Sequence, residues 1–590
     1  MLKTSKLHKH ICEFCILLLL VVSLLSRDMA SPYERVIGCD GFGYYSYLPA
    51  LFIYHDLSFS FVNEVYPKYY EVLKNTPLAT THIINEFDGH RVNKYYPGVS
   101  ILLCPFFLIA LLSAKLAGFA TDGYSKIFQF TIVLAALFYV WLGLIFLKKL
   151  LNRHNYTPWL VSLTLILILF GSNLYSCSIT SYSPSYAHCY LFFLVSLFCY
   201  QASLLFDKNN DPKEKYIFWL LLTLSLIIVT RPQDGLIILT LPLFGLTFQK
   251  MKEVIKRTFN SVSGLSGIFT GLILLASVLV LWHKQTGCFF VNSYHGEYFD
   301  LLRPHITDFL LGFRSGWLTY TPLMLFALSG IFLLKGRATF ILLIFWTVVI
   351  FVLSSWWWWI YPGPALGQRV MVEYYPIAAL TLIAFLDFLH KKKYGALALA
   401  IPFLVIPLNI LQTLQFKTGI ISTQYASSQS YFRNFFKTRP VPQYPIPKSI
   451  IESMIEIPIQ DFSILTQSNR FSAGKKVPLP DFIKTDDYSH IRASMRIRSN
   501  SPKIKDVVVF DFSHKGKSIS WNGFGLSPYI YDKDWSYYEC GMLLPSTVAP
   551  GDSIAFYVWK PEGNDSTFVE NLKLEFIRIN DSYDFRIGHP

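Results

Sequence analysis

The sequence predicts a polytopic α-helical membrane protein with an all-β sandwich or jelly-roll domain at its C-terminal end. Three observations support this prediction. The 590 residues are 53% hydrophobic and only 15% charged, whereas a soluble chain has about 25% charged residues. Apolar runs of roughly 20 residues recur between residues 127 and 412, and each is long enough for a membrane helix. After residue 412, short segments rich in Val, Ile and Phe alternate with turn sequences.

The apolar runs predict about 11 membrane spans. We place them at residues 11–26, 127–147, 158–175, 186–206, 216–231, 234–248, 262–282, 317–335, 338–355, 372–390 and 395–412. Basic clusters fall at residues 3–9, 148–153, 208–215, 250–257, 335–337 and 391–393. A cytoplasmic N-terminus puts every cluster on the cytoplasmic side, as the positive-inside rule requires. We therefore expect a multi-pass protein of a bacterial cytoplasmic (inner) membrane, anchored by an uncleaved first segment.

The sequence predicts two domains. Residues 1–412 form the membrane domain, with a first extracytoplasmic loop at 27–126. Within that loop, the apolar stretch 97–118 is long enough to cross, but crossing would turn the 148–153 basic cluster outward. We therefore expect it to begin and end outside. Residues 413–590 form the β-domain, where "DVVVFDF", "SIAFYVW" and "LKLEFIRI" are predicted strands. Span parity puts this domain in the periplasm.

Composition also excludes some functions. The net charge of +14 comes from Lys and Arg residues dispersed between apolar runs, so we expect no nucleic-acid binding. The nine cysteines form no disulfide framework. No set of His, Cys, Asp or Glu residues has metal-ligand spacing, so no metal site is predicted.

Polar chemistry gathers on the predicted outer face. Asp40 follows the first span directly, in "GCDGFGYYSYLPAL"; "NKYYPG", "TRPQDG" and "GQR" lie on the same side. The spans carry almost no charge apart from Glu373 and Asp387. A coupled transporter usually carries ionisable groups at mid-membrane depth. The pattern therefore favours an enzyme that acts at the membrane surface on a lipid-linked substrate.

Residues 1–412 resemble the GT-C glycosyltransferases, the superfamily of protein O-mannosyltransferases and lipid A aminoarabinose transferases. "GCDGFGYY" is similar to the Gly-Asp-Gly-x-x-Tyr-Tyr form of bacterial members, and "NKYYPG" resembles the Lys-x-Pro stretch that meets the donor phosphate. "GQR" before a membrane helix also fits these relatives. The chain differs from eukaryotic members in having Gly41 where they have the second acid of an Asp-Glu pair.

The resemblance implies inverting transfer of a sugar from a polyprenyl-phosphate donor to an envelope glycan, lipid or protein acceptor. Such a reaction needs a base for the acceptor hydroxyl and a cation for the departing phosphate. We assign the base to Asp40. The candidates for binding the donor phosphate and the lipid-linked sugar are Lys94, Arg369, Gln368, Arg231, Tyr44, Tyr45, Tyr96 and His188. Some relatives use a divalent cation and others do not, so no cofactor is assigned and a divalent cation stays open.

Simpler interpretations exist for several of these candidates. Asp40 could cap the helix that follows it, and Lys94 could be an interfacial anchor. Arg231 could form a structural ion pair with Asp234, and His188 could be a packing histidine. The tryptophan run 356–359 fits an aromatic belt, with sugar stacking as the alternative.

Three other functions stay open at the sequence level. A polysaccharide polymerase or ligase also works at the outer face, but usually through large loops rich in Arg and His. If the protein were a lipid or glycan transporter, its transport activity would survive the loss of Asp40. In a scaffold for envelope assembly, no single outer-loop residue would matter.

Overall fold

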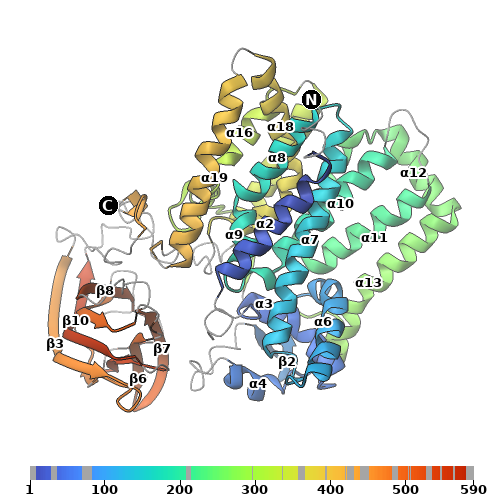
Figure 1. Ribbon diagram of the computed structural model, residues 1–590. Coiled ribbons are helices and arrows are strands. Elements are labelled where there is room, and N and C mark those ends of the chain that lie inside the picture. The colour runs from blue at the N-terminus through green and yellow to red at the C-terminus, as the bar shows by residue number, and fades with distance from the viewer. Residues whose placement is uncertain are drawn as a thin grey trace.

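The computed structural model places the helices and one short hairpin in the first part of the chain, and eight further strands after residue 450 form a separate body beside the helices (Figure 1). It describes residues 8–27, 36–69, 83–206, 214–294, 297–334, 336–356, 366–392, 395–418, 420–421, 431–432, 434–438, 451–472, 474–481, 489–501, 504, 506–526, 535–544, 548–549, 551–561 and 565–579. Parts of four predicted basic clusters (3–9, 208–215, 335–337 and 391–393) lie outside these residues.

Six helices are long and apolar enough to cross a membrane. They are α6 (Gly98–Ala117), α7 (Lys126–Asn152), α10 (Ala187–Leu205), α13 (Val262–Thr286), α17 (Arg337–Ser354) and the continuous segment of η6 (Arg369–Tyr374) and α18 (Tyr375–Lys391). A seventh results if α8 (Pro158–Phe170) and α9 (Asn173–Ile179) form one span, bent by 56°. The described residues thus support a membrane protein, but they do not confirm about 11 spans.

Several predicted spans are short or interrupted. The first, α2 (Ile11–Leu25), has 15 residues and is apolar, but it falls short of the roughly 20 residues that a bilayer requires. Residues 317–335 divide into α15 (Trp317–Tyr320) and α16 (Leu323–Ile331), with Pro322 at the break. Residues 234–248 fall mostly in a 3-10 helix, η4 (Pro232–Phe244), which contains Pro242.

Four further helices lie between or after these spans along the chain. They are α11 (Glu214–Thr230), α12 (Phe248–Asn260), α14 (Ile306–Leu311) and α19 (Gly395–Lys417). Helix α11 packs against α10 and α13, and α16 packs against α18. One large apolar core extends through these helices.

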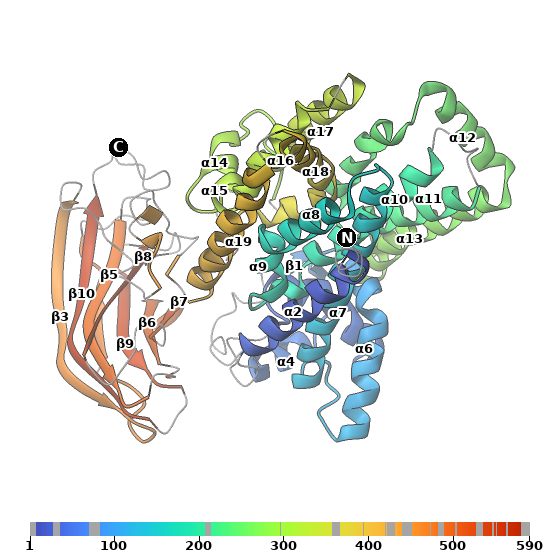
Figure 2. The same cartoon turned by 45° about the horizontal axis from the view of Figure 1, so that its top comes forward.

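The first loop is mostly ordered structure. It contains α3 (Asp40–Phe52), α4 (Val62–Tyr69) and a hairpin of β1 (Ile84–Phe87) and β2 (His90–Asn93). Asp88 and Gly89 both have positive φ, as a tight hairpin turn requires. Helix α6 follows and lies alongside α7 (Figure 2). The segment predicted at 97–118 is thus one continuous helix with enough length to span; that it begins and ends on one side stays a prediction.

The C-terminal strands pair into two antiparallel four-stranded sheets with a common apolar core. One sheet has the order β3 (Ile451–Leu465), β10 (Thr567–Ile579), β5 (Ser489–Ser499) and β8 (Ser536–Leu543). The other has β4 (Lys475–Pro478), β9 (Ser553–Trp559), β6 (Val507–His514) and β7 (Lys517–Gly525). Along β9, buried and partly exposed residues alternate strictly. The predicted C-terminal β-sheet region and its three quoted strands are confirmed, whereas the periplasmic location of this region stays a prediction.

Candidate functional site

Asp40 is the first residue of α3, and a close approach between two helices fixes its position. Gly41 lies against η3 (Ser183–Ser185), so a Cβ at residue 41 would fall 1.6 Å from Ser185 Oγ. Any larger residue would push α3 away from η3 and move Asp40 with it. Cys39 holds the N-cap position, and Asp40 lies inside the first helical turn. Asp40 therefore does not cap the helix.

Asp40 forms an ion pair with Arg369, the first residue of η6, although 329 residues separate them. Arg369 Nη2 donates to Asp40 Oδ2, and the guanidinium lies 4.5 Å from the centre of the Tyr186 ring. Both side chains retain contact with solvent, with 27% of Asp40 and 19% of Arg369 exposed. Arg369 Nη1 is buried and makes no hydrogen bond to any described residue. An acid and a cation therefore meet where a substrate can reach them.

Tyrosines surround this pair. The Tyr95 hydroxyl hydrogen-bonds Asp40. Burial, and then the charge of Asp40, raises the pKa of Tyr95 well above its ordinary value. The phenol therefore stays protonated and donates a hydrogen bond to the carboxylate. The Tyr44 and Tyr95 rings lie 4.4 Å apart. The Lys94 ammonium lies 5.5 Å from the centre of the Tyr95 ring and forms an ion pair with Glu297.

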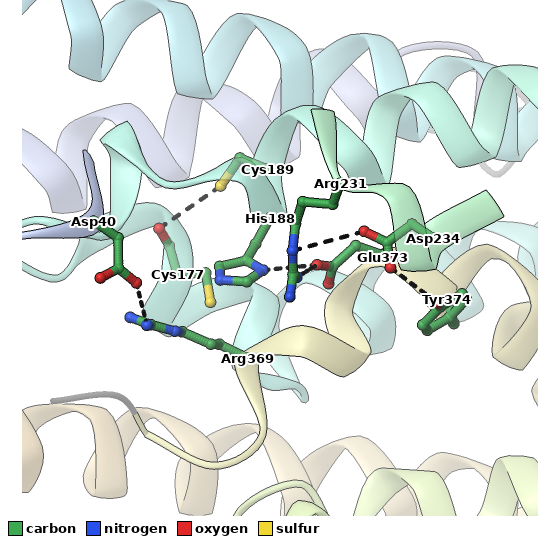
Figure 3. Close-up of polar contacts among 9 residues, drawn as sticks. All are labelled: Asp40, Cys177, His188, Cys189, Arg231, Asp234, Arg369, Glu373 and Tyr374. Carbon is green, nitrogen blue, oxygen red and sulfur yellow. Dashed lines mark hydrogen bonds and ion pairs between the residues drawn. The ribbon is translucent and has the colours of Figure 1, made fainter. Parts of the chain in front are cut away.

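A second charged cluster lies beside the Asp40–Arg369 pair (Figure 3). Glu373 Oε1 lies 2.9 Å from His188 Nδ1, in a hydrogen bond, and accepts from Arg231 Nη1 at 2.6 Å. Arg231 Nε lies 3.9 Å from Asp234 Oδ2, and the Tyr374 hydroxyl donates to Asp234 Oδ1 at 2.8 Å. We call these five residues the inner cluster.

The inner cluster is almost completely excluded from solvent. His188 and Arg231 are each 5% exposed, and Glu373, Asp234 and Tyr374 are 0% exposed. Its members come from the start of α10, the junction of α11 with η4, and η6. Burying several charges costs free energy that only good mutual pairing offsets. Ionisable groups among apolar helices are usually functional for that reason.

The structure thus brings Asp40, Arg369, His188 and Arg231 into one connected region, with Tyr44 and Lys94 at its edge. Three other predicted residues make contacts elsewhere. The Tyr45 hydroxyl donates to the Gly123 carbonyl at 2.5 Å. Gln368 Nε2 donates to Ser315 Oγ at 3.2 Å. The Tyr96 ring packs against Trp282 and Tyr294. Of the tryptophan run 356–359, only Trp356 belongs to the described residues.

Sequence reasoning did not assign Glu373 or Asp234 to the site. Both carried a usable signal, because each is a lone acid within an apolar segment. The same signal marks Asp387, which instead pairs with Lys391 on the outside of α18. Tyr95, Tyr186 and Glu297 carried no signal of their own. Only the folded chain brings them to the site.

Among the described residues, no group of three or more His, Cys, Asp and Glu side chains is placed to hold a metal ion. The site therefore consists of carboxylates, guanidinium groups, an imidazole and phenols. Such a set can accept a proton at Asp40 and hold an anion at Arg369. No protein-family model, no curated protein and no solved structure matches the chain.

Proposed function

We propose that this protein is an integral membrane glycosyltransferase, which moves a sugar from a polyprenyl-phosphate donor to an acceptor outside the cytoplasm. The observation that carries the proposal is the partly exposed Asp40–Arg369 pair, next to helices apolar enough for a membrane. A lipid-linked donor presents its phosphate at this kind of boundary. The GT-C resemblance of "GCDGFGYY" and "NKYYPG" supports the same reaction.

Each group then has a role. Asp40 accepts the proton as the acceptor O–H bond breaks, and the acceptor oxygen bonds to the anomeric carbon. The bond from that carbon to the phosphate oxygen breaks, and its electron pair leaves with the lipid phosphate. Arg369 holds this phosphate, because a planar guanidinium pairs well with phosphate oxygens and Nη1 has no other acceptor among the described residues. Lys94 and Arg231 add positive charge nearby.

The first test is the Asp40→Asn variant. Purified protein is reconstituted with a panel of polyprenyl-phosphate sugars, and release of the free carrier is measured together with donor binding. We expect turnover by the wild type and a loss of about 100-fold or more in D40N, with the donor still bound. Asp387→Asn is the matched control, since Asp387 pairs with Lys391 at the surface, and it should behave as the wild type.

Equal turnover in D40N and the wild type would remove Asp40 from the mechanism. Absence of turnover by the wild type with every donor would contradict the transferase. The cell-envelope setting of the proposal, with a periplasmic C-terminal domain, is tested separately by labelling single cysteines introduced on β7 in intact cells.

A lipid or glycan transporter is the second candidate, and the inner cluster favours it. Coupled transporters use buried ionisable groups of this kind for proton or ion binding. This candidate predicts movement of the intact lipid-linked sugar across proteoliposomes without release of the carrier. It also predicts that movement survives D40N but fails in Glu373→Gln.

A further inference from the structure

Helix α12 presents a stripe of exposed apolar side chains. Phe248, Met251, Ile255 and Phe259 are between 37% and 66% exposed. At about 100° per residue, these four positions fall on one side of the helix. Large apolar side chains that are exposed together usually mark a surface that contacts another apolar phase. We call these four residues the apolar stripe.

The other two sides of α12 have different surroundings. Val254 packs against the apolar core of the membrane domain, and Thr258 is buried one turn later. Lys252 and Lys256 are exposed on the side next to the apolar stripe, and neither forms an ion pair with a described residue. Lys252 Nζ lies 4.6 Å from the centre of the Phe248 ring. One side of α12 thus packs on the protein, one is apolar and exposed, and one is basic.

The helix has few acids to balance its cations. Its sequence contains Lys250, Lys252, Lys256 and Arg257 against the single acid Glu253. Glu253 pairs with Arg257 at 2.7 Å. The two lysines beside the apolar stripe therefore present net positive charge to an anion outside the chain.

The apolar stripe continues onto α13, which is long and apolar enough to cross a membrane. Ser261 is both the C-cap of α12 and the N-cap of α13. Val262 and Phe269 are exposed on α13, and only 22% of its apolar window is buried. The other end of α13 lies at the candidate site, where Trp282 packs on Tyr96, and α12 lies at the far end (Figure 1).

Predicted cytoplasmic segments meet at the start of α12. Lys250 Nζ donates to the Phe206 carbonyl at 3.1 Å, and Arg337 Nη2 donates to the Leu246 carbonyl at 3.1 Å. Lys250 and Arg337 belong to two of the basic clusters, and Phe206 lies just before a third. The positive-inside rule makes this end of α13 the cytoplasmic one.

We propose that α12 lies in the cytoplasmic interface of the membrane and binds the headgroups of anionic phospholipids. The apolar stripe enters the boundary between headgroups and acyl chains, while Lys252 and Lys256 extend to the lipid phosphates. Lipid fits this surface better than a second copy or a partner protein, because the stripe is continuous with the exposed apolar side of α13. The proposal does not depend on the proposed function.

The first test locates the apolar stripe in bilayers that contain the full-length protein. A bimane fluorophore is attached through Ile255→Cys, in a variant whose exposed Cys288 is replaced by serine. Gln249→Cys, exposed on the basic side, is the matched control. Phospholipids brominated on their acyl chains should quench the label at residue 255, and aqueous iodide should quench the label at residue 249.

The second test measures the lipid preference at the same place. Brominated phosphatidylglycerol or brominated phosphatidylcholine is diluted into phosphatidylcholine bilayers, and quenching at residue 255 gives their relative affinity. The protein should prefer phosphatidylglycerol, and each of Lys252→Gln and Lys256→Gln should lower the preference by about fivefold at low ionic strength. Changing Lys475 and Lys476, two exposed lysines of β4, to glutamine should leave it unchanged.

Three results would overturn the proposal. Quenching of residue 255 by iodide, as strong as that of residue 249, would place the stripe in water. Protection of residue 255 from both quenchers would show that protein, such as a second copy, covers the stripe. Quenching by lipid with no preference for phosphatidylglycerol would remove the anionic headgroup. None of these results bears on carrier release, so the proposed transferase is judged separately.

Discussion

Replacement of Arg231 by methionine should destabilise the protein strongly, because the inner cluster has more acids than it can then neutralise. Glu373 Oε1 lies 2.6 Å from Arg231 Nη1, and Asp234 Oδ2 lies 3.9 Å from Arg231 Nε. Both acids are 0% exposed, and the second oxygen of each, Glu373 Oε2 and Asp234 Oδ2, has no hydrogen-bond partner among the described residues. Without Arg231, His188 and Tyr374 would be the side chains still hydrogen-bonded to the two buried carboxylates among the described residues.

The expected magnitude follows from this burial. Removing one partner of a buried ion pair costs about 3–5 kcal/mol, because the other charge stays desolvated. Glu373→Gln should cost less, about 1–3 kcal/mol, since Arg231 keeps Asp234 nearby. Adding Glu373→Gln to Arg231→Met should restore part of the loss, because it removes one uncompensated charge.

The assay is unfolding by SDS in mixed micelles, followed by tryptophan fluorescence and extrapolated to the free energy of unfolding. Arg257→Met is the matched control. Arg257 forms an ion pair of nearly equal length, 2.7 Å, with Glu253, but the two side chains are 34% and 41% exposed. Such a surface pair contributes about 0–1 kcal/mol. If Arg231→Met cost no more than Arg257→Met, the inner cluster would not be a buried ionic network.

Three further outcomes are expected. A backbone N–H group and then His514 hold the pKa of Asp552 below its ordinary value of 3.8. The ionised Asp552 therefore stabilises the folded β-domain fully above pH 3.8, and this stabilisation is lost as the pH falls through the lower pKa of the folded state. Acid unfolding of the β-domain, followed by tryptophan fluorescence, should therefore start at higher pH in Asp552→Asn, and coincident curves would contradict this. Lys560→Met should lower the free energy of unfolding of the β-domain by about 3–5 kcal/mol in urea titration, since buried Asp506 lies 3.1 Å from Lys560 Nζ; a cost below that of Lys573→Met at the surface would refute it. Gly41→Ala should lower both carrier release and thermal stability, because its Cβ would fall 1.6 Å from a facing hydroxyl oxygen; unchanged thermal stability would show that α3 can shift freely.

The chain order of elements was largely predictable. Helices α7, α10, α13, α17 and α18 lie where long apolar runs placed them, and β6, β9 and β10 lie where short segments rich in Val, Ile and Phe placed strands. Hydropathy and residue composition are local properties, so they are readable without the fold. The breaks within the apolar segments were not predictable from the sequence. The bend between α8 and α9 and the division of 317–335 at Pro322 depend on how neighbouring helices pack, and a hydropathy run continues through both.

The candidate site divides in the same way. Sequence alone singled out Asp40, Arg369, Arg231 and His188, because each is a polar residue in a segment on the predicted outer face. It could not show that Asp40 pairs with Arg369, or that one oxygen of Glu373 binds both His188 and Arg231. These contacts join residues 142 to 329 positions apart, and no local pattern encodes them.

The sequence by itself determined that the chain carries segments apolar enough for a membrane, that β-strands follow them, and which few polar side chains the apolar segments carry. The tertiary structure decided which of those side chains meet. The physical reason is that hydrophobicity is a property of each segment, whereas an ion pair exists only where packing brings two segments together. The contact of Gly41 with η3 positions Asp40. Helix η6 brings Arg369 to Asp40 and Glu373 to His188.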